Sequence, residues 1–323
     1  MRFPYSGQGK PLLRVALTLA ELSLSTMLLL EAVSTAAGSN DVIVPIEFKR
    51  GHIMVPATVN GSNRVWLMLD TGFSITLIDP RLADLLELRP LGKTTIAGIA
   101  GEERADVFEG PTFDFGGASY TPRRLAVLSS ERTKRPRRME GVLGAGFFRR
   151  FIVEIDSKGR TIKLHEPKEY EYAGSGEMLP LKIRNSTPVI DAAINIPGRP
   201  SIRGQFEIDT GCDGGLCLGH DFVDANKLLQ TGGPVQGGGR SGVGGDARTK
   251  VGSVPELQLG RFAVKKPEVN FFLQGSPVER GHAGHIGMEV LRQFRVIFDY
   301  SRERLILERP EEDGIREKKT EHK

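Results

Sequence analysis

V-W-L-M-L-D-T-G (residues 65–72) joins an uninterrupted apolar run to a D-T-G tripeptide at its end. A short apolar run of this kind is typical of a strand that is buried on both faces. A second D-T-G occupies residues 209–211 and follows Phe206-Glu207-Ile208, a strand-like segment of similar character. The chain therefore carries the same strand-and-loop pattern twice.

A longer internal repeat surrounds the two tripeptides. The segment G-V-L-G-A-G-F-F-R-R-F-I-V-E-I-D (141–156) aligns with G-H-I-G-M-E-V-L-R-Q-F-R-V-I-F-D (284–299). The spacing between these two segments is nearly the spacing between the two D-T-G tripeptides. We therefore predict one structural unit of roughly 140 residues that is used twice.

Composition favours a β-rich globular fold. The chain has 39% hydrophobic and 26% charged residues, which is typical of soluble globular proteins. Its 39 glycines and 19 prolines favour short strands joined by turns. We predict a mostly β fold with two small barrel-like lobes and a few short helices, such as those over 80–88 and 219–229.

The ends of the chain differ from its middle. Basic, then apolar, then small residues are the order of a secretory signal, and this order predicts a periplasmic or secreted protein. The longest uncharged apolar part, Leu22 to Leu30, is too short for an integral membrane span, and a helical extension of a cytosolic protein is the alternative. The predicted regions are a signal peptide or N-terminal extension (1–38), a first lobe (39–170), a second lobe (171–310) and a disordered charged tail (311–323).

The two D-T-G loops point to hydrolytic chemistry. Hydrolysis of an amide needs an activated water molecule and a proton donor. Two carboxylates brought face to face can supply both, because like charges this close cannot both ionise and the pair holds one proton. Asp70 and Asp209 are the candidates, and the sequence leaves open which of them carries the proton.

The other residues of the tripeptides fit this role. Gly72 and Gly211 allow a tight loop whose backbone N–H groups can approach the carboxylate. Thr71 and Thr210 can donate their hydroxyl groups across the junction between the two units.

These motifs resemble those of the pepsin- and retropepsin-type aspartic proteases, most closely the retropepsin-like proteins with both lobes in one chain. D-T-G-F-S-I-T-L-I (70–78) and D-T-G-C-D-G-G-L-C-L (209–218) resemble the two active-site loops of that family. Val142-Leu143-Gly144 and His285-Ile286-Gly287 resemble the apolar elements that pack behind those loops. The resemblance covers most of residues 42–310.

The resemblance implies a bilobal acid-protease fold and an aspartic-type endopeptidase that acts on peptides or proteins. It implies catalytic Asp70 and Asp209 and interlocking Thr71 and Thr210. No cofactor is predicted, and the repeat with its short linker favours a monomer over the alternative in which lobes pair between chains. A β-hairpin that closes over the substrate is also implied. Its candidate in the first lobe is 96–102, with Gly98, Ile99, Ala100 and Gly101 as substrate-binding residues, and the candidate in the second lobe is 237–245.

Two residues depart from the family pattern. Asp213 stands two residues after the second tripeptide, where the first loop has Ser74, and it could raise the pKa of the carboxylate pair or bind a cation. His285 stands where an aliphatic residue is expected. These departures motivate the alternative of an inactive module that keeps the fold and binds a peptide or a partner.

Other chemistries find little support. His282 and His285 lack a helix and an acidic partner that would make a zinc site, so no metal is predicted. The basic cluster within 132–138 lacks interleaved aromatic residues, so no nucleic-acid partner is predicted. Cys212 and Cys217 could form one disulfide, although two free, buried thiols are favoured.

Overall fold

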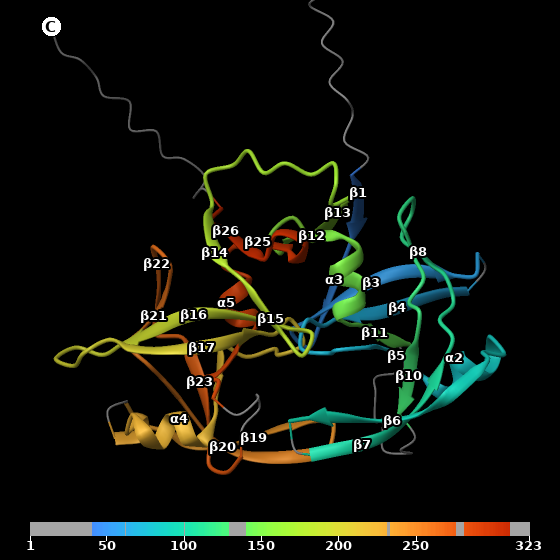
Figure 1. Ribbon diagram of the computed structural model, residues 1–323. Helices are drawn as coiled ribbons and strands as arrows, with labels where there is room; N and C mark the ends of the chain where they lie inside the picture. The colour runs from blue at the N-terminus through green and yellow to red at the C-terminus, as the bar shows by residue number, and fades with distance from the viewer. Residues whose placement is uncertain are drawn as a thin grey trace, which may run out of the picture. The chain divides into compact units, whose positions relative to one another are not determined.

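The computed structural model describes residues 41–61, 63–99, 101–128, 140–230, 233–275 and 281–310 (Figure 1). Strand β4 (Asn63–Leu69), which leads into the first D-T-G, buries alternate side chains. It is joined to β3 (His52–Val59) by a turn in which Asn60 and Gly61 have φ of 47° and 76°. Val59 and Asn63 face each other across the two strands, and Asn and Gly are the residues that adopt a positive φ most readily in so short a connection. The strand predicted over 65–69 is confirmed, but its predicted burial on both faces is wrong, because Trp66 and Met68 on the second face are only partly buried.

The first large sheet contains ten strands. Strand β4 lies between β3, which is antiparallel to it, and β11, which is parallel to it. Strand β2 pairs with β3 outside the main order. The main order is β6 (Pro90–Gly98), β7 (Gly101–Phe108), β10 (Leu125–Leu128), β5 (Thr76–Ile78), β11 (Gly141–Leu143), β4, β3, β8 (Phe113–Asp114) and β9 (Ser119–Tyr120), with β2 at Glu47–Lys49.

The second large sheet has the same arrangement. Strand β17, which leads into the second D-T-G, lies between antiparallel β16 and parallel β24, and β15 pairs with β16. The main order is β19 (Gln236–Gly242), β20 (Gly245–Ser253), β23 (Glu268–Phe272), β18 (Leu216–Leu218), β24 (Gly284–Ile286), β17 (Ile202–Ile208), β16 (Thr187–Asn195), β21 (Glu256–Leu259) and β22 (Phe262–Lys265), with β15 at Lys182–Arg184. Every strand of the first sheet thus has a counterpart in the second.

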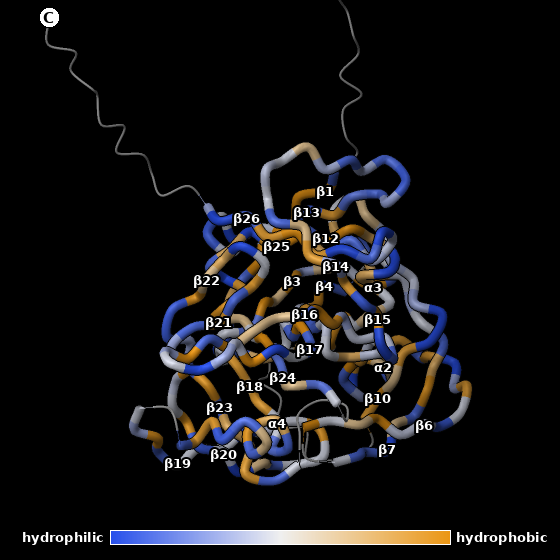
Figure 2. The backbone as a smooth tube through the Cα atoms, turned by 60° about the vertical axis from the view of Figure 1, so that its left-hand side comes forward, coloured by the Kyte–Doolittle hydropathy of each residue, from blue (hydrophilic) through white to orange (hydrophobic). Residues whose placement is uncertain are grey.

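A third sheet of six strands takes three strands from each half of the chain. Its order is β1 (Val42–Pro45), β13 (Thr161–His165), β12 (Ile152–Asp156), β25 (Arg295–Asp299), β26 (Arg304–Glu308) and β14 (Glu177–Pro180). The halves meet at its centre, where β12 and β25 pair antiparallel and Val153 faces Phe298. Figure 2 shows these two strands as largely hydrophobic, in agreement with their buried side chains. The polar segment 168–176 runs between β13 and β14.

The described helices are short. Asp79 caps the first of them by accepting a hydrogen bond from the backbone N–H of Arg81, and Pro80 occupies its first turn. This helix ends earlier than the predicted 80–88 because Glu87 adopts a positive φ of 49°. The helices are α2 (Pro80–Leu85), α3 (Ala145–Arg150), α4 (His220–Ala225), α5 (Met288–Leu291), η1 (Leu228–Gln230) and η2 (Tyr300–Arg302). None in the described part of the chain is long and apolar enough to cross a membrane.

The predicted barrel-like closure of the two units is wrong, although the mostly β character is confirmed. The described strands of each large sheet run between two separate edges, β6 and β9 in the first and β19 and β22 in the second. Strands β6 and β19 carry mostly exposed residues. These two edge strands therefore lack the apolar side chains that would pack inside a closed barrel. The predicted signal (1–38), the basic cluster (132–138) and the charged tail (311–323) lie outside the described residues.

Candidate active site

The two D-T-G tripeptides occupy equivalent positions at the ends of β4 and β17. The backbone N–H of Asp70 donates to the carbonyl of Leu143 at 3.0 Å, and that of Asp209 donates to the carbonyl of Ile286 at 3.0 Å. Both acceptors end the parallel neighbours β11 and β24. The apolar elements singled out in the sequence therefore fix the start of each loop.

The threonines of the two loops bind each other. The N–H of Thr71 donates to Oγ1 of Thr210, and the N–H of Thr210 donates to Oγ1 of Thr71, each at 3.0 Å. The Thr71 hydroxyl donates to the carbonyl of Ile208 at 2.6 Å, and the Thr210 hydroxyl donates to that of Leu69 at 2.9 Å. Both threonines are fully buried. Each loop is thus held by the other half of the chain.

This interlock brings the carboxyl groups of Asp70 and Asp209 together. Gly72 N–H donates to Oδ1 of Asp70 and Gly211 N–H donates to Oδ1 of Asp209, both at 2.9 Å. A Cβ at Gly72 would lie 2.9 Å from Oδ1 of Asp209, and a Cβ at Gly211 would overlap the carboxyl group of Asp70. Glycine is required at both positions because each carboxyl group approaches the backbone of the opposite loop.

Burial and mutual contact make the two carboxyl groups unequal. Burial raises the pKa of Asp70 well above its usual value, and the negative charge of Asp209 raises it further. Burial also raises the pKa of Asp209, but the charge and hydrogen bond of His285, with the Gly211 N–H, outweigh it and lower that pKa. A hydrogen bond between the two carboxyl groups adds to both shifts. Two carboxyl groups this close favour one shared proton, and the opposite directions of the two pKa shifts favour the protonated form of Asp70.

His285 is the second departure from the family pattern, and it contacts the pair directly. Its Nδ1 lies 3.0 Å from Oδ2 of Asp209, and its Nε2 lies 3.4 Å from Oε2 of Glu207. His282 Nδ1 lies 2.8 Å from Oε1 of Glu207. Sequence analysis named both histidines but missed Glu207, although a charged residue inside the strand Phe206-Glu207-Ile208 is an unusual feature that could have revealed it.

Asp213 and Ser74 have different surroundings. Ser74 is exposed in the turn after the first D-T-G, whereas Asp213 accepts a hydrogen bond of 2.5 Å from Arg240 on β19. The Arg240 cation thus neutralises the third carboxylate, which makes it a poor cation ligand. Arg240 was not singled out in the sequence, and its place within a run of glycines was the available signal. Among the described residues, no group of three or more His, Cys, Asp or Glu could hold a metal ion.

The cysteines of the second loop lie close together as free thiols. The Sγ atoms of Cys212 and Cys217 are 3.6 Å apart, and both residues are unbridged. Cys217 is buried and Cys212 is half-buried. The hydrogen bond from its neighbour, with burial, raises the pKa of the Cys212 thiol well above its usual value. The prediction of two free, buried thiols is confirmed for Cys217, whereas Cys212 is free but only half-buried. The raised pKa makes Cys212 a poor nucleophile.

Both predicted flaps are β-hairpins whose tips meet. The first is β6–β7 and the second is β19–β20, and Figure 1 shows them on the same side of the molecule. A Cβ at Gly98 would lie 2.5 Å from the carbonyl oxygen of Val243, and one at Gly242 would lie 2.7 Å from Cγ2 of Ile99. Gly101 faces Gly244 in the same contact. Ala100 lies outside the described residues.

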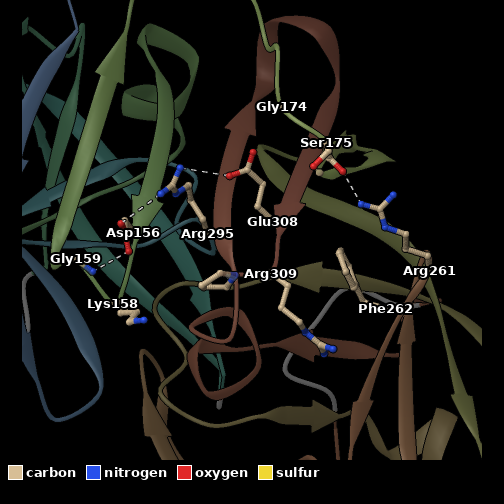
Figure 3. Close-up of a pocket in the computed structure, with 12 residues that line it drawn as sticks. Asp156, Lys158, Gly159, Gly174, Ser175, Arg261, Phe262, Arg295, Glu308 and Arg309 are labelled. Atoms are coloured by element: carbon tan, nitrogen blue, oxygen red, sulfur yellow. Dashed lines mark hydrogen bonds and ion pairs between the residues drawn. The ribbon is translucent and has the colours of Figure 1, made fainter. Parts of the chain in front are cut away.

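The structure also contains a cavity of about 700 Å³. Figure 3 shows the side chains that line it. Residues around β12, β25 and β26 line it, together with the segment 174–176 and Arg261. Arg295 makes ion pairs there with Asp156 at 3.8 Å and Glu308 at 3.4 Å. Neither Asp70 nor Asp209 lines this cavity, so we place the candidate active site at the interlocked loops instead.

Comparison with known proteins agrees with that choice. Residues 55–147 match the aspartyl protease family, a range that includes β4, the first D-T-G and β11. This part of the chain is similar to aspartyl proteases. The match ends before the second D-T-G. No curated protein matches the sequence significantly.

Proposed function

We propose that the chain is an aspartic-type endopeptidase that hydrolyses peptide bonds with Asp70 and Asp209. The observation that carries the proposal is the close approach of the two carboxyl groups, each packed against the glycine of the opposite loop and held between interlocked loops. The aspartyl protease match over residues 55–147 supports the same chemistry for the first loop. The shared strand order of the two large sheets supports a single-chain, two-lobed retropepsin-type arrangement.

Each carboxyl group has a distinct part in the proposed reaction. The Asp209 carboxylate takes a proton from a water molecule, and the water oxygen bonds to the carbonyl carbon of the scissile peptide. Asp70 gives its proton to the carbonyl oxygen, so the tetrahedral intermediate is a neutral gem-diol. Asp209 then returns its proton to the amide nitrogen while Asp70 recovers one from a hydroxyl group. The C–N bond breaks, and an acid and an amine leave.

The substrate we infer is an extended peptide between the interlocked loops and the two hairpins. The hairpin tips touch over glycines, which leave backbone groups accessible to a peptide main chain. Lids of this kind exclude water from the reaction and must open for binding and release. Because one chain supplies both carboxyl groups, we infer that the active form is a monomer.

The test is cleavage of an unbiased peptide library between pH 3 and pH 8 by the full chain, by Asp70→Asn and by Asp209→Asn. We expect cleavage by the wild type and none by either variant. A mixture of the two variants should also be inactive, since an active site shared between two chains would recover activity on mixing. A folded wild type that cuts no peptide at any pH would refute the proposal and favour a peptide- or partner-binding module.

A further inference from the structure

His285 is the centre of a buried chain of charged groups that ends on the candidate catalytic pair. Its two ring nitrogens contact two different carboxylates, Asp209 at 3.0 Å and Glu207 at 3.4 Å. On the far side of Glu207, the second histidine contacts it at 2.8 Å. The side chains of His285 and Glu207 are only 11% and 7% exposed, so water screens these contacts little.

The first half of the chain has apolar residues at the equivalent positions. In the second sheet, His285 of β24 faces Glu207 of β17 and Cys217 of β18. In the first sheet, Val142 of β11 faces Met68 of β4 and Leu77 of β5. The two loops are therefore alike in backbone but unlike in charge behind the carboxyl groups.

We propose that His285 is a positioning residue for the reaction, which, as an imidazolium held between Glu207 and Asp209, keeps the negative charge on Asp209 and leaves the shared proton on Asp70. This inference rests on the proposed peptidase function and deepens it. It assigns the base to Asp209 and the acid to Asp70 before substrate binds. Glu207 orients the imidazolium through its contact with Nε2 of His285, and His282 holds Glu207 in turn.

The groups that face His285 favour its charged form. From β17 and the loop after it come the carboxylates of Glu207 and Asp209, and from β18 and that loop come the thiols of Cys217 and Cys212. The charge of His285 also reaches the second carboxyl group of the pair, where it lowers the pKa of Asp70. Burial lowers the pKa of His285, but the two carboxylates outweigh it and raise that pKa well above its usual value.

An imidazolium at this position widens the pH range of the required protonation state. A positive charge 3.0 Å from Asp209 resists protonation of that carboxylate as the pH falls. The acid limb of the pH–rate profile, where Asp209 takes up a proton, should therefore lie at lower pH than for two carboxyl groups alone. An opposite charge this close shifts a carboxyl pKa by roughly one to three units.

The internal equivalence of the two sheets supplies the test variant. Glu207→Met combined with His285→Val replaces the polar pair by the residues of the first sheet. We expect the acid limb of kcat/KM to move upward by about one to three pH units, so that activity below the limb falls at least tenfold. His285→Gln keeps a polar side chain but no charge, and it should move the acid limb in the same direction. This variant replaces the double variant in the test if the double variant does not fold.

His165→Gln is a matched control. His165 is also buried between two carboxylates, Asp41 at 2.6 Å and Glu154 at 3.3 Å, but it lies in the six-stranded sheet away from the pair. Loss of this imidazole should leave both limbs of the profile unchanged. An equal shift in this variant would mean that a change of overall charge, and not contact with Asp209, moves the limb, and would overturn the proposal.

A readout independent of activity separates the two proposals. ¹⁵N NMR of the full chain should show the His285 ring doubly protonated well above pH 6.5, and Asp209→Asn should lower its titration midpoint by about one to three pH units. A midpoint near 6.5 that Asp209→Asn leaves unmoved would overturn the role of His285. If the wild type cleaves peptides and the acid limb does not move, the positioning role fails alone. If the ring is charged but nothing is cleaved, the peptidase fails, and with it a role for His285 in that reaction.

Discussion

Thr71 and Thr210 each donate a backbone N–H to the hydroxyl oxygen of the other, at 3.0 Å in both directions. Their hydroxyl groups donate in turn to Ile208 and Leu69, the last residues of the opposite strands. Four buried hydrogen bonds therefore join two loops that are 139 residues apart. The position of each carboxyl group depends on the other half of the chain.

Thr71→Val should destabilise the protein without changing the size of the side chain. It leaves the N–H of Thr210 and the carbonyl of Ile208 unpaired, and each buried unpaired group costs about 1–3 kcal/mol. We expect the free energy of unfolding in urea to fall by roughly 2–5 kcal/mol and peptide cleavage to be lost. Thr71→Ser keeps the hydroxyl and should retain most of both.

The control for this prediction is Thr249→Val. Thr249 is also buried, but its hydroxyl makes one described hydrogen bond, to Asn270 at 3.2 Å. Its loss should cost less and should leave cleavage intact. Equal destabilisation in the two valine variants would show that the interlock contributes no more than an ordinary buried threonine.

Gly98→Ala should separate the two hairpin tips. A Cβ there meets the backbone of Val243, whereas a Cβ at Gly237, on the second hairpin, meets nothing within 4 Å. We expect faster hydrogen exchange of the amides in 96–104 and 240–247, and a KM raised several-fold, because the closed lid is less populated. Gly237→Ala should change neither quantity, and the same exchange rates in both variants would argue against a tip contact in solution.

Asp70→Asn and Asp209→Asn should change stability in opposite directions. The folded pKa of Asp70 is raised, so its contribution is fully present below the unfolded value near 3.9 and is lost as the pH rises through the folded value. Asparagine suffers no such loss, so Asp70→Asn should be the more stable protein at pH 7. The difference is about 1.4 kcal/mol for each unit between the two pKa values.

Asp209 has the opposite sign. Its folded pKa is lowered, so its contribution is present above the unfolded value and is lost as the pH falls through the folded value. Asp209→Asn removes that contribution and also leaves His285 with Glu207 as its remaining carboxylate partner. We expect Asp209→Asn to be less stable than the wild type at pH 7. Urea unfolding of the three proteins at pH 3, 5 and 7 checks both signs, and equal curves for the two variants would contradict them.

Local patterns in the sequence predicted the elements but not the contacts between them. The apolar run before Asp70 and the Asn60-Gly61 pair are local features of the sequence. The structure has a strand at the first and a turn at the second. The pair Glu207–His285 depends on the parallel register of β17 and β24, and the pair Arg240–Asp213 depends on how a hairpin folds back over a loop. Neither register nor hairpin orientation is encoded within a short window. The catalytic roles, the lobe boundary and the export signal stay predictions.

The two halves of the chain should fold only together. Strand β12 has β25 as its neighbour, so a fragment of residues 39–170 would expose that edge and lose the contact of Phe148 with Phe298, whose ring centroids are 5.3 Å apart. The same fragment would lose the partner of Thr71. We expect the fragment alone to lack a cooperative thermal transition by circular dichroism.

Co-expression with residues 171–323 should restore that transition, and the two fragments should elute as one species. The reason is that the six-stranded sheet is completed by pairing across the halves and not by the polar connection 168–176. Phe298→Ala, which leaves the fragments able to pair but removes a fully buried ring, should weaken their association, whereas Phe262→Ala, a half-buried ring in β22, should weaken it less. A fragment of residues 39–170 that unfolds cooperatively by itself would show that each half is an independent domain.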